Sequence, residues 1–364
     1  MQQKNNFFLG KAEFKKWILP LCLLVFIIIL KCSPSNIESY YSNGIYIGLS
    51  KFLRIITGWI PISLGDLLYF FLGIKLAIWI IKLFITLFKK HATLQNFGIG
   101  FLRVIKTLLW IYIIFNLLWA LNYNRLGIAY QLKLSQEKYT KEEVENLVCD
   151  LVQKVNDTRK IIGNDTLPEI NFKEIFATSY AAYETVAQEY NFLNYTNLSA
   201  KKSMYSGISH YMGFTGYYNP FSGEAQLSTD VPNILMPYIA CHEMAHQLGY
   251  ASESEANFVG YLACSKSKDI YFKYSVYLDL YKYAATELFL KDLSTTHNWE
   301  LDSLVRNDYR EIRNFYAKKR NSIAPLVGSM YSQYLKANQQ SRGIESYNDV
   351  VGWLISYKKK YGKI

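Results

Sequence analysis

Three long apolar stretches in the first third of the chain limit the folds that are open to it. They cover residues 17–32, 60–88 and 101–123 approximately, and each carries few charged residues. A helix of about 20 apolar residues crosses the hydrocarbon core of a bilayer, so the pattern predicts three transmembrane helices. The first stretch follows several lysines but has no convincing small-residue cleavage site, so we expect an uncleaved anchor.

The positive charge of the chain is concentrated in the same region. The formal net charge is +11, and residues 1–123 hold 13 basic but only 3 acidic residues, whereas the remainder is nearly balanced. A nucleic-acid-binding protein gathers its basic residues on a folded surface, so we expect no nucleic-acid partner. The excess of basic residues in this region instead indicates how the chain is oriented in a membrane.

Two basic segments predict the orientation in the membrane. Lysines precede the first stretch, and Lys89, Lys90 and Arg103 lie between the second and third stretches. Basic loops stay in the cytoplasm, so residues 124–364 should form a domain on the opposite, outer side. If one apolar stretch were a buried helix of that domain, the domain would face the cytoplasm instead.

Residues 124–364 have the composition of a soluble domain that is mainly α. A capping box at Thr140 and Glu143 predicts a helix that runs to about Ile162, and a second helix is expected over 173–190. Aromatic residues around the turn at 219–223 predict a β-hairpin within 211–228. The expected fold is therefore transmembrane helices followed by an α+β domain with a small sheet.

A possible metal site follows the predicted hairpin. His242, Glu243 and His246 form an HExxH motif. Residues four apart share one face of a helix, so both imidazoles can reach one ion, and zinc suits such ligands. Glu243 lies at the edge of that face, where it can accept a proton from water on the metal. Pro232 or Pro237 could start this helix, and Gly249 could end it.

The next segment offers a third ligand. Ser252 and Glu255 fit a capping box, so a second helix should start beside His246. Glu253 is the favoured ligand and Glu255 the alternative, while Asn257 could hydrogen-bond a ligand imidazole from behind. His210 and His297 are possible third ligands that lack a supporting context.

The block from His242 to Phe258 resembles the gluzincin metallopeptidases, in which a second helix supplies a glutamate ligand within a Glu-x-x-x-Asp pattern. Glu253 takes the place of the glutamate and Asn257 that of the aspartate, which is one departure. The short gap between His246 and Glu253 is another. Three spans plus this block also look like a family of bacterial membrane proteins of unknown function. The resemblance implies a zincin-like domain and a location in the bacterial inner membrane.

The expected function is that of a membrane-anchored zinc metallopeptidase acting on a peptide or protein. Zinc would activate a water molecule, and Glu243 would act as the general base. The hairpin edge could bind an extended substrate, or it could simply belong to the sheet.

Two other classes of function compete with this reading. One is a non-catalytic envelope protein with a structural or relict metal site, in which a fourth ligand such as Cys241 would close the coordination. The other is a transporter, which three spans with few charges disfavour. Cys241 and Cys264 flank the motif, and we expect them to fill the core rather than to pair.

Overall fold

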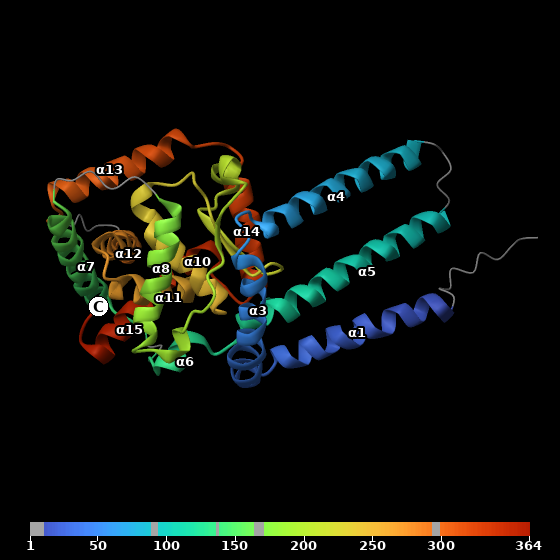
Figure 1. Cartoon of the computed structure of the whole chain (residues 1–364), viewed down its shortest axis with the longest axis horizontal. Helices are drawn as coiled ribbons and strands as arrows, with labels where there is room; N and C mark the ends of the chain where they lie inside the picture. The colour runs from blue at the N-terminus through green and yellow to red at the C-terminus, as the bar shows by residue number, and fades with distance from the viewer. Residues whose placement is uncertain (1–10, 89–93, 136–137, 164–170, 293–298) are drawn as a thin grey trace, which may run out of the picture.

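The computed structural model describes residues 11–88, 94–135, 138–163, 171–292 and 299–364. Three rod-like helices extend in one direction from a compact helical domain (Figure 1). They are α1 (Lys11–Lys31), α4 (Leu64–Phe88) and α5 (Leu94–Leu118). By length and composition two segments can cross a membrane, Leu64–Ile85 and Gly98–Leu118, and a third can if α1 and the helix bent away from it are taken together. These helices confirm the apolar spans expected near the N-terminus.

The ends of the rods differ from the predicted spans because the domain holds them. The apolar stretch expected to end at residue 123 stops being α-helical at Leu118, and residues 120–124 form a 3₁₀ turn. There Asn122 accepts a 2.8 Å hydrogen bond from Ser42. At the start of α4, the carboxylate of Glu224 accepts the backbone N–H groups of Leu64 and Gly65 at 3.1 and 2.6 Å. A carboxylate at this position also favours the helix dipole.

The segment between the first two rods is helical. It contains α2 (Pro34–Asn36), a π-helix (Ile37–Ile45) and α3 (Tyr46–Gly58). It bends 99° away from α1. The polar side chains of α3 find hydrogen-bond partners in the folded domain.

Helices make up most of the domain. They are α6 (Gly127–Leu132), α7 (Lys141–Ile162), α8 (Phe172–Ala187), α9 (Ser209–Met212), α10 (Met236–Gln247), α11 (Glu253–Lys266), α12 (Ile270–Lys291), α13 (Ser303–Lys318), α14 (Ala324–Ala337) and α15 (Val350–Tyr361). Short 3₁₀ turns cover Asn191–Leu193, Ser206–Ile208, Asn233–Leu235 and Gly343–Asp349. The capping box predicted for α7 is present, because Thr140 and Glu143 each accept the other's backbone N–H.

A three-stranded sheet lies beside α10. Its strands are β1 (Ala200–Lys202), β2 (Gly216–Asn219) and β3 (Glu224–Leu227), in the order β1-β3-β2. β2 and β3 form the expected antiparallel hairpin, with Tyr217 opposite Gln226, while β1 pairs with β3 in parallel. The hairpin prediction is therefore confirmed, and β2 is left at an edge of the sheet.

The main core lies around α10 and α11, which are buried on all sides. Leu147, Leu151 and Val155 of α7 contribute to it, as do apolar residues of α8, α12 and α15. A second apolar cluster, which includes Ile27, Ile113 and Trp119, joins the rods to Tyr46 and Ala251 at the edge of the domain. The connection between α10 and α11 is thus packed against the domain core on one side and against the rods on the other.

Candidate metal centre

Helix α10 carries the two histidines, and its ends form as the sequence predicts. Pro237 lies in the first turn, where a missing N–H costs little. Gly249 follows the last turn with φ +90°, which a residue with a Cβ adopts only with strain. This turn reverses the chain after five residues, so that Glu253, the first residue of α11, returns towards His246.

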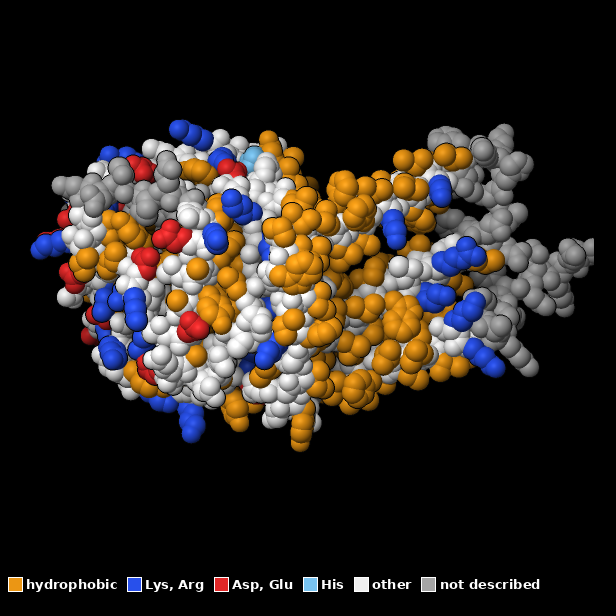
Figure 2. Space-filling view, in the orientation of Figure 1, with side chains coloured by type: hydrophobic (Ala, Val, Ile, Leu, Met, Phe, Trp, Pro, Cys, Tyr) orange, Lys and Arg blue, Asp and Glu red, His pale blue; other side chains and the backbone are white. Residues whose placement is uncertain are grey.

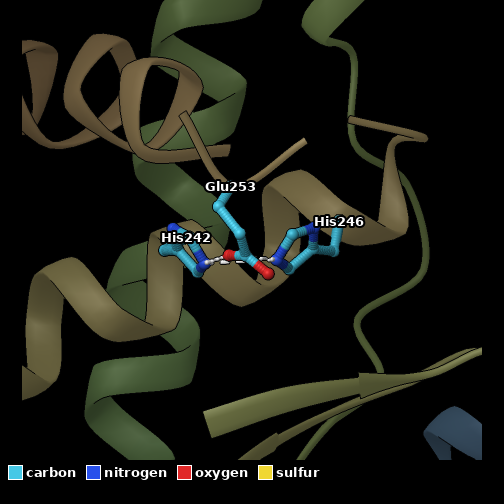
Figure 3. Close-up of side chains that lie close together, drawn as sticks. All are labelled: His242, His246 and Glu253. Carbon is cyan, nitrogen blue, oxygen red and sulfur yellow. Dashed lines mark hydrogen bonds and ion pairs between the residues drawn. The ribbon is translucent and has the colours of Figure 1, made fainter. Parts of the chain in front are cut away.

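The side chains of His242, His246 and Glu253 meet at one point (Figure 3). The Nε2 atoms of the two imidazoles are 3.1 Å apart, and Glu253 Oε2 lies 3.3 Å from that of His242 and 3.5 Å from that of His246. All three side chains are buried. Among the described residues, this is the group of His, Cys, Asp and Glu side chains whose spacing could hold a metal ion. We call these three residues the metal cluster.

The hydrogen bonding of His246 fixes its tautomer. Nδ1 lies 2.7 Å from the carbonyl oxygen of Tyr250, which can only accept, so Nδ1 donates. Nε2 of the neutral ring then presents its lone pair to His242 and Glu253. Glu253 Oε2 is buried without a hydrogen-bond donor among the described residues. With His246 neutral, its Nε2 lone pair and Glu253 Oε2 lie beside His242 Nε2, and two imidazole nitrogens with one carboxylate oxygen are a donor set that zinc binds.

Burial and mutual charge shift the pKa values in the cluster. Burial opposes charge on His246 and Glu253, but the interaction between these two partners and their neighbours outweighs it. Beside the Glu253 carboxylate the pKa of His246 is raised to about 9, and beside the imidazoles the pKa of Glu253 lies well below its usual range. Without a metal, a proton on His246 thus stabilises the buried carboxylate of Glu253. A divalent cation would replace that proton.

Glu243 lies next to the metal cluster but outside it. Burial raises the pKa of its carboxyl to about 7, although the two histidines pull it the other way. Its Oε2 atom has no hydrogen-bond partner among the described residues. Gly216 of β2 comes so close that a Cβ there would stand 2.6 Å from Glu243 Oε1. The candidate base therefore faces the first residue of the edge strand.

The two other candidates on α11 do not lie where the sequence suggested. Glu255 turns away from the histidines, and its Oε1 accepts the backbone N–H of Ile128 at 2.7 Å, at the start of α6. The helix does start after Ser252, but the side chain of Ser252 makes no capping bond. The capping box predicted from Ser252 and Glu255 is wrong, because Glu255 caps a different helix. Asn257 donates to the carbonyl of Tyr347 at 3.4 Å, and no described hydrogen bond joins it to an imidazole.

The remaining sequence candidates that the structure describes do not join the cluster. His210 pairs with Asp230, with 3.3 Å between Nδ1 and Oδ2. His297 lies outside the described residues. Cys241 and Cys264 are both buried free thiols, in agreement with a packing role, and Cys241 is not part of the metal cluster.

Residues far along the chain complete the surroundings of Glu253. Tyr331 of α14 donates to Glu253 Oε1 at 2.6 Å, and Gln340 accepts the backbone N–H of Glu253 at 3.1 Å. The ring of Tyr347 stacks over His242, with centroids 6.4 Å apart. Helix α14 thus covers the site. Sequence reasoning missed these residues because 31 tyrosines offered no spacing that singles out one of them.

Helix α3 supports the metal cluster from the other side. Ser50 and Arg54 donate to the carbonyl of Gln247 at 2.6 and 3.1 Å, and Tyr46 reaches the carbonyls of His246 and Gln247 at 3.4 and 3.3 Å. The last carbonyls of a helix have no partner within it, so these donors satisfy the end of α10. A cation such as Arg54 also suits the negative end of the helix dipole.

Comparison with known proteins assigns no chemistry to this site. No curated protein and no solved structure matches the chain. One family model matches residues 41–355, which takes in α3, the second and third rods and the whole metal cluster. The chain belongs to this family, which is described as a protein of unknown function (DUF3810).

Proposed function

We propose that this protein is a membrane-anchored zinc metallopeptidase. The observation that carries the proposal is the meeting of His242, His246 and Glu253 at one buried point, with Nδ1 of His246 committed to a carbonyl. Such a set of two imidazoles and one carboxylate is the ligand set of catalytic zinc sites, which keep one position open. This arrangement also supports the resemblance of the sequence to gluzincins.

Each group has a distinct task in the proposed reaction. Zinc, when bound, would act as a Lewis acid and lower the pKa of a water molecule to about 7. Glu243 takes the proton from the attacking water and passes it to the leaving amine, and a carboxyl whose pKa is about 7 suits both steps near neutral pH. Tyr331 fixes the carboxylate of Glu253 by its hydrogen bond.

Strand β2 is the proposed guide for the substrate. It lies at the edge of the sheet, and its first residue, Gly216, is in contact range of Glu243. An extended peptide added to this edge would gain main-chain hydrogen bonds and pass the candidate base. The cluster is buried and Tyr331 of α14 contacts Glu253, so we expect α14 to move when a substrate binds.

The proposed location is the bacterial inner membrane, with the domain outside the cytoplasm. Basic side chains gather towards the ends of the rods that lie far from the domain (Figure 2). Lys15, Lys16 and Arg103 belong to these helices, while Lys89 and Lys90 fall outside the described residues. A membrane-impermeant maleimide applied to intact spheroplasts should label the exposed Cys149 of the domain. Labelling only after lysis would reverse the orientation.

A structural metal site is the competing function, and its sign would be a closed coordination sphere. No fourth His, Cys, Asp or Glu joins the cluster within the part of the chain that the structure describes. Cys241, the residue that could have closed the site, is packed in the core. The cluster therefore favours the open position that a reaction with water needs.

The test uses the full-length protein in lipid nanodiscs. Zinc content is measured by mass spectrometry, and cleavage is measured on a library of quenched fluorescent peptides. We expect about one zinc per chain, and we expect Glu243→Gln to keep the zinc while cleavage falls by about 10²–10⁴-fold. Zinc binding without any cleavage by the wild-type protein would favour the structural site. Equal cleavage by Glu243→Gln and wild type would overturn the role of Glu243.

A further inference from the structure

Helix α3 is amphipathic, but its polar face is buried and its apolar face is exposed. Its buried face is polar and consists of Tyr46, Ser50, Arg54 and Thr57. Every one of these side chains is hydrogen-bonded to the domain or to its own helix, as by Thr57 to Ser199 at 2.7 Å. A helix that packs on a domain from water normally buries its apolar stripe instead. Hydrogen bonds therefore hold the inner face of α3 to the domain, and Tyr46 also packs in the second apolar cluster.

The outer face of α3 is apolar and has no protein cover. Phe52 is 59% exposed, Ile47 is 54% exposed, and Trp59 at the end of the helix is 79% exposed. Ile55 and Ile56 complete this face, and they too are exposed. A contiguous group of large apolar side chains on a protein surface marks an interaction site. We call these five residues the outer face of α3.

The direction of α3 relative to the rods identifies the partner. The segment that contains α3 is bent 99° from α1, and the axes of α1, α4 and α5 are roughly parallel, with α4 running opposite to the other two (Figure 1). If the rods cross the bilayer, α3 therefore lies close to the membrane plane. It also lies at the end of the rods that joins the domain, where the membrane surface would be.

The apolar surface is continuous from the rods to the base of the domain. Figure 2 shows hydrophobic side chains over the rods and on across the segment where α3 lies in Figure 1. Lys51 is the exposed charged residue of α3, and a lysine side chain can extend its amine to the headgroup layer. Trp59 is the type of residue that favours the membrane–water interface. These features all suit lipid rather than another protein.

We propose that α3 is an interfacial helix, lying in the plane of the membrane with its outer face among the lipid acyl chains. A helix is about 10 Å thick, so the last turn of α10, which the inner face binds, would lie only about that far above the lipid. The bilayer thereby positions the end of the helix that carries His242 and His246. This proposal rests on the fold and does not depend on zinc or on cleavage.

Site-directed spin labelling tests the proposal on the full chain in vesicles of phosphatidylcholine and phosphatidylglycerol. Cys22, Cys32 and Cys149 are first replaced by serine, and the buried Cys241 and Cys264 are kept. Nitroxides are placed through Ile47→Cys, Phe52→Cys and Ile56→Cys. Glu184→Cys on the exposed surface of α8 is the water control, and Ile74→Cys in α4 is the lipid control. Collisions with oxygen report lipid, and collisions with a neutral nickel chelate report water.

We expect the three α3 labels to collide with oxygen more than with nickel, by at least about threefold relative to the Glu184→Cys label. We also expect labels at positions 47 and 56 to lie at similar depth, because an in-plane helix has little rise across the bilayer. A depth difference of about 13 Å between them would mean that α3 crosses the membrane and would overturn the proposal. Nickel accessibility equal to that of the water control would also overturn it, as would protection from both reagents, which would indicate a protein partner such as a second copy.

Discussion

The metal cluster and a second buried cluster lie on opposite sides of the first turn of α11, and both contain carboxylates. The second cluster consists of Glu38, Arg125 and Glu255, and we call it the α6 cap because its carboxylates receive the first N–H groups of α6. Arg125 donates to both oxygens of Glu38 at 2.9 and 2.8 Å. In the α6 cap each carboxylate faces protein donors, whereas in the metal cluster the carboxylate faces two imidazole nitrogens.

The two clusters differ in how many hydrogen-bond donors surround their buried carboxylates. A buried carboxylate is stable when donors surround it, and Glu38 has five, contributed by Arg125, Gly127, Asn43 and Gln131. In the metal cluster, Glu253 Oε2 and His242 Nδ1 have no hydrogen-bond partner among the described residues, and neither does Oε2 of the neighbouring Glu243. Buried polar atoms without partners are rare in folded proteins, so these atoms support the proposal that a ligand binds here.

The largest effect should come from replacing Glu253, and the matched replacement of Glu255 is the comparison. Glu253→Ala removes one of three ligands, so we expect zinc affinity to fall by at least about 1,000-fold, which is about 4 kcal/mol. Glu255→Gln should keep zinc within a factor of about three, since its carboxyl only caps α6. Competition with a chromophoric chelator measures both affinities. Zinc loss in Glu255→Gln with zinc retained in Glu253→Ala would reverse the assignment.

The next effect concerns the acid stability of the α6 cap. Burial opposes charge on Glu38, but Arg125 and the N–H of Gly127 outweigh it and lower the pKa of Glu38 below 4.5. A lowered pKa contributes stability above pH 4.5, and this contribution is lost as the pH falls through the pKa of the folded state. We expect Glu38→Gln to lose about 2–3 kcal/mol at pH 7, because Arg125 is left buried without its partner charge.

The same substitution should flatten the acid side of the stability curve. Thermal unfolding in nanodiscs, followed by circular dichroism from pH 7 to pH 3, should show the wild-type and Glu38→Gln midpoints converging below pH 4.5. A constant gap between the two curves across this range would mean that the charge of Glu38 does not stabilise the fold. Zinc content at pH 7 should be equal in the two proteins, because Glu38 does not touch the metal cluster.

A smaller effect should follow from crowding Glu243. Gly216→Ala adds a methyl group whose carbon would stand 2.6 Å from Glu243 Oε1, so the carboxylate must move. We expect kcat to fall by about 100-fold with zinc unchanged, because a base displaced by about 1 Å loses its alignment with water. Gly207→Ala is a matched control, since a Cβ at that position meets nothing within 4 Å. An unchanged kcat in Gly216→Ala would mean that Glu243 is not the general base.

The smallest effect is expected at the cover of the site. Tyr331→Phe removes the 2.6 Å hydrogen bond to Glu253 while keeping the ring. Loss of such an outer hydrogen bond should weaken zinc by about 10-fold, at the low end of the usual range. Tyr334 lies about one turn further along α14, and Tyr334→Phe loses only the hydrogen bond to Tyr123. This substitution should leave zinc binding unchanged. A weaker zinc site in Tyr334→Phe than in Tyr331→Phe would contradict this ranking.

Local patterns were enough to predict several parts of the protein. The apolar spans, the helix from the Thr140 capping box and the β2–β3 hairpin depend on residues close in the chain, and they formed as expected. His242 and His246 could be paired because the helical repeat alone brings residues four apart together. Glu253 could be proposed because the link from α10 to α11 is short.

Tertiary structure decided the roles that depend on distant partners. Glu253 and Glu255 stand in the same first turn and are chemically identical, and only the arrival of α6 gives Glu255 a donor at Ile128. Tyr331 contacts Glu253 from 78 residues away, and the polar face of α3 meets α10 across about 200 residues. The sequence alone determines what a segment can form locally, but the hydrogen-bond partner of a buried polar group is set by the elements that the fold packs against it.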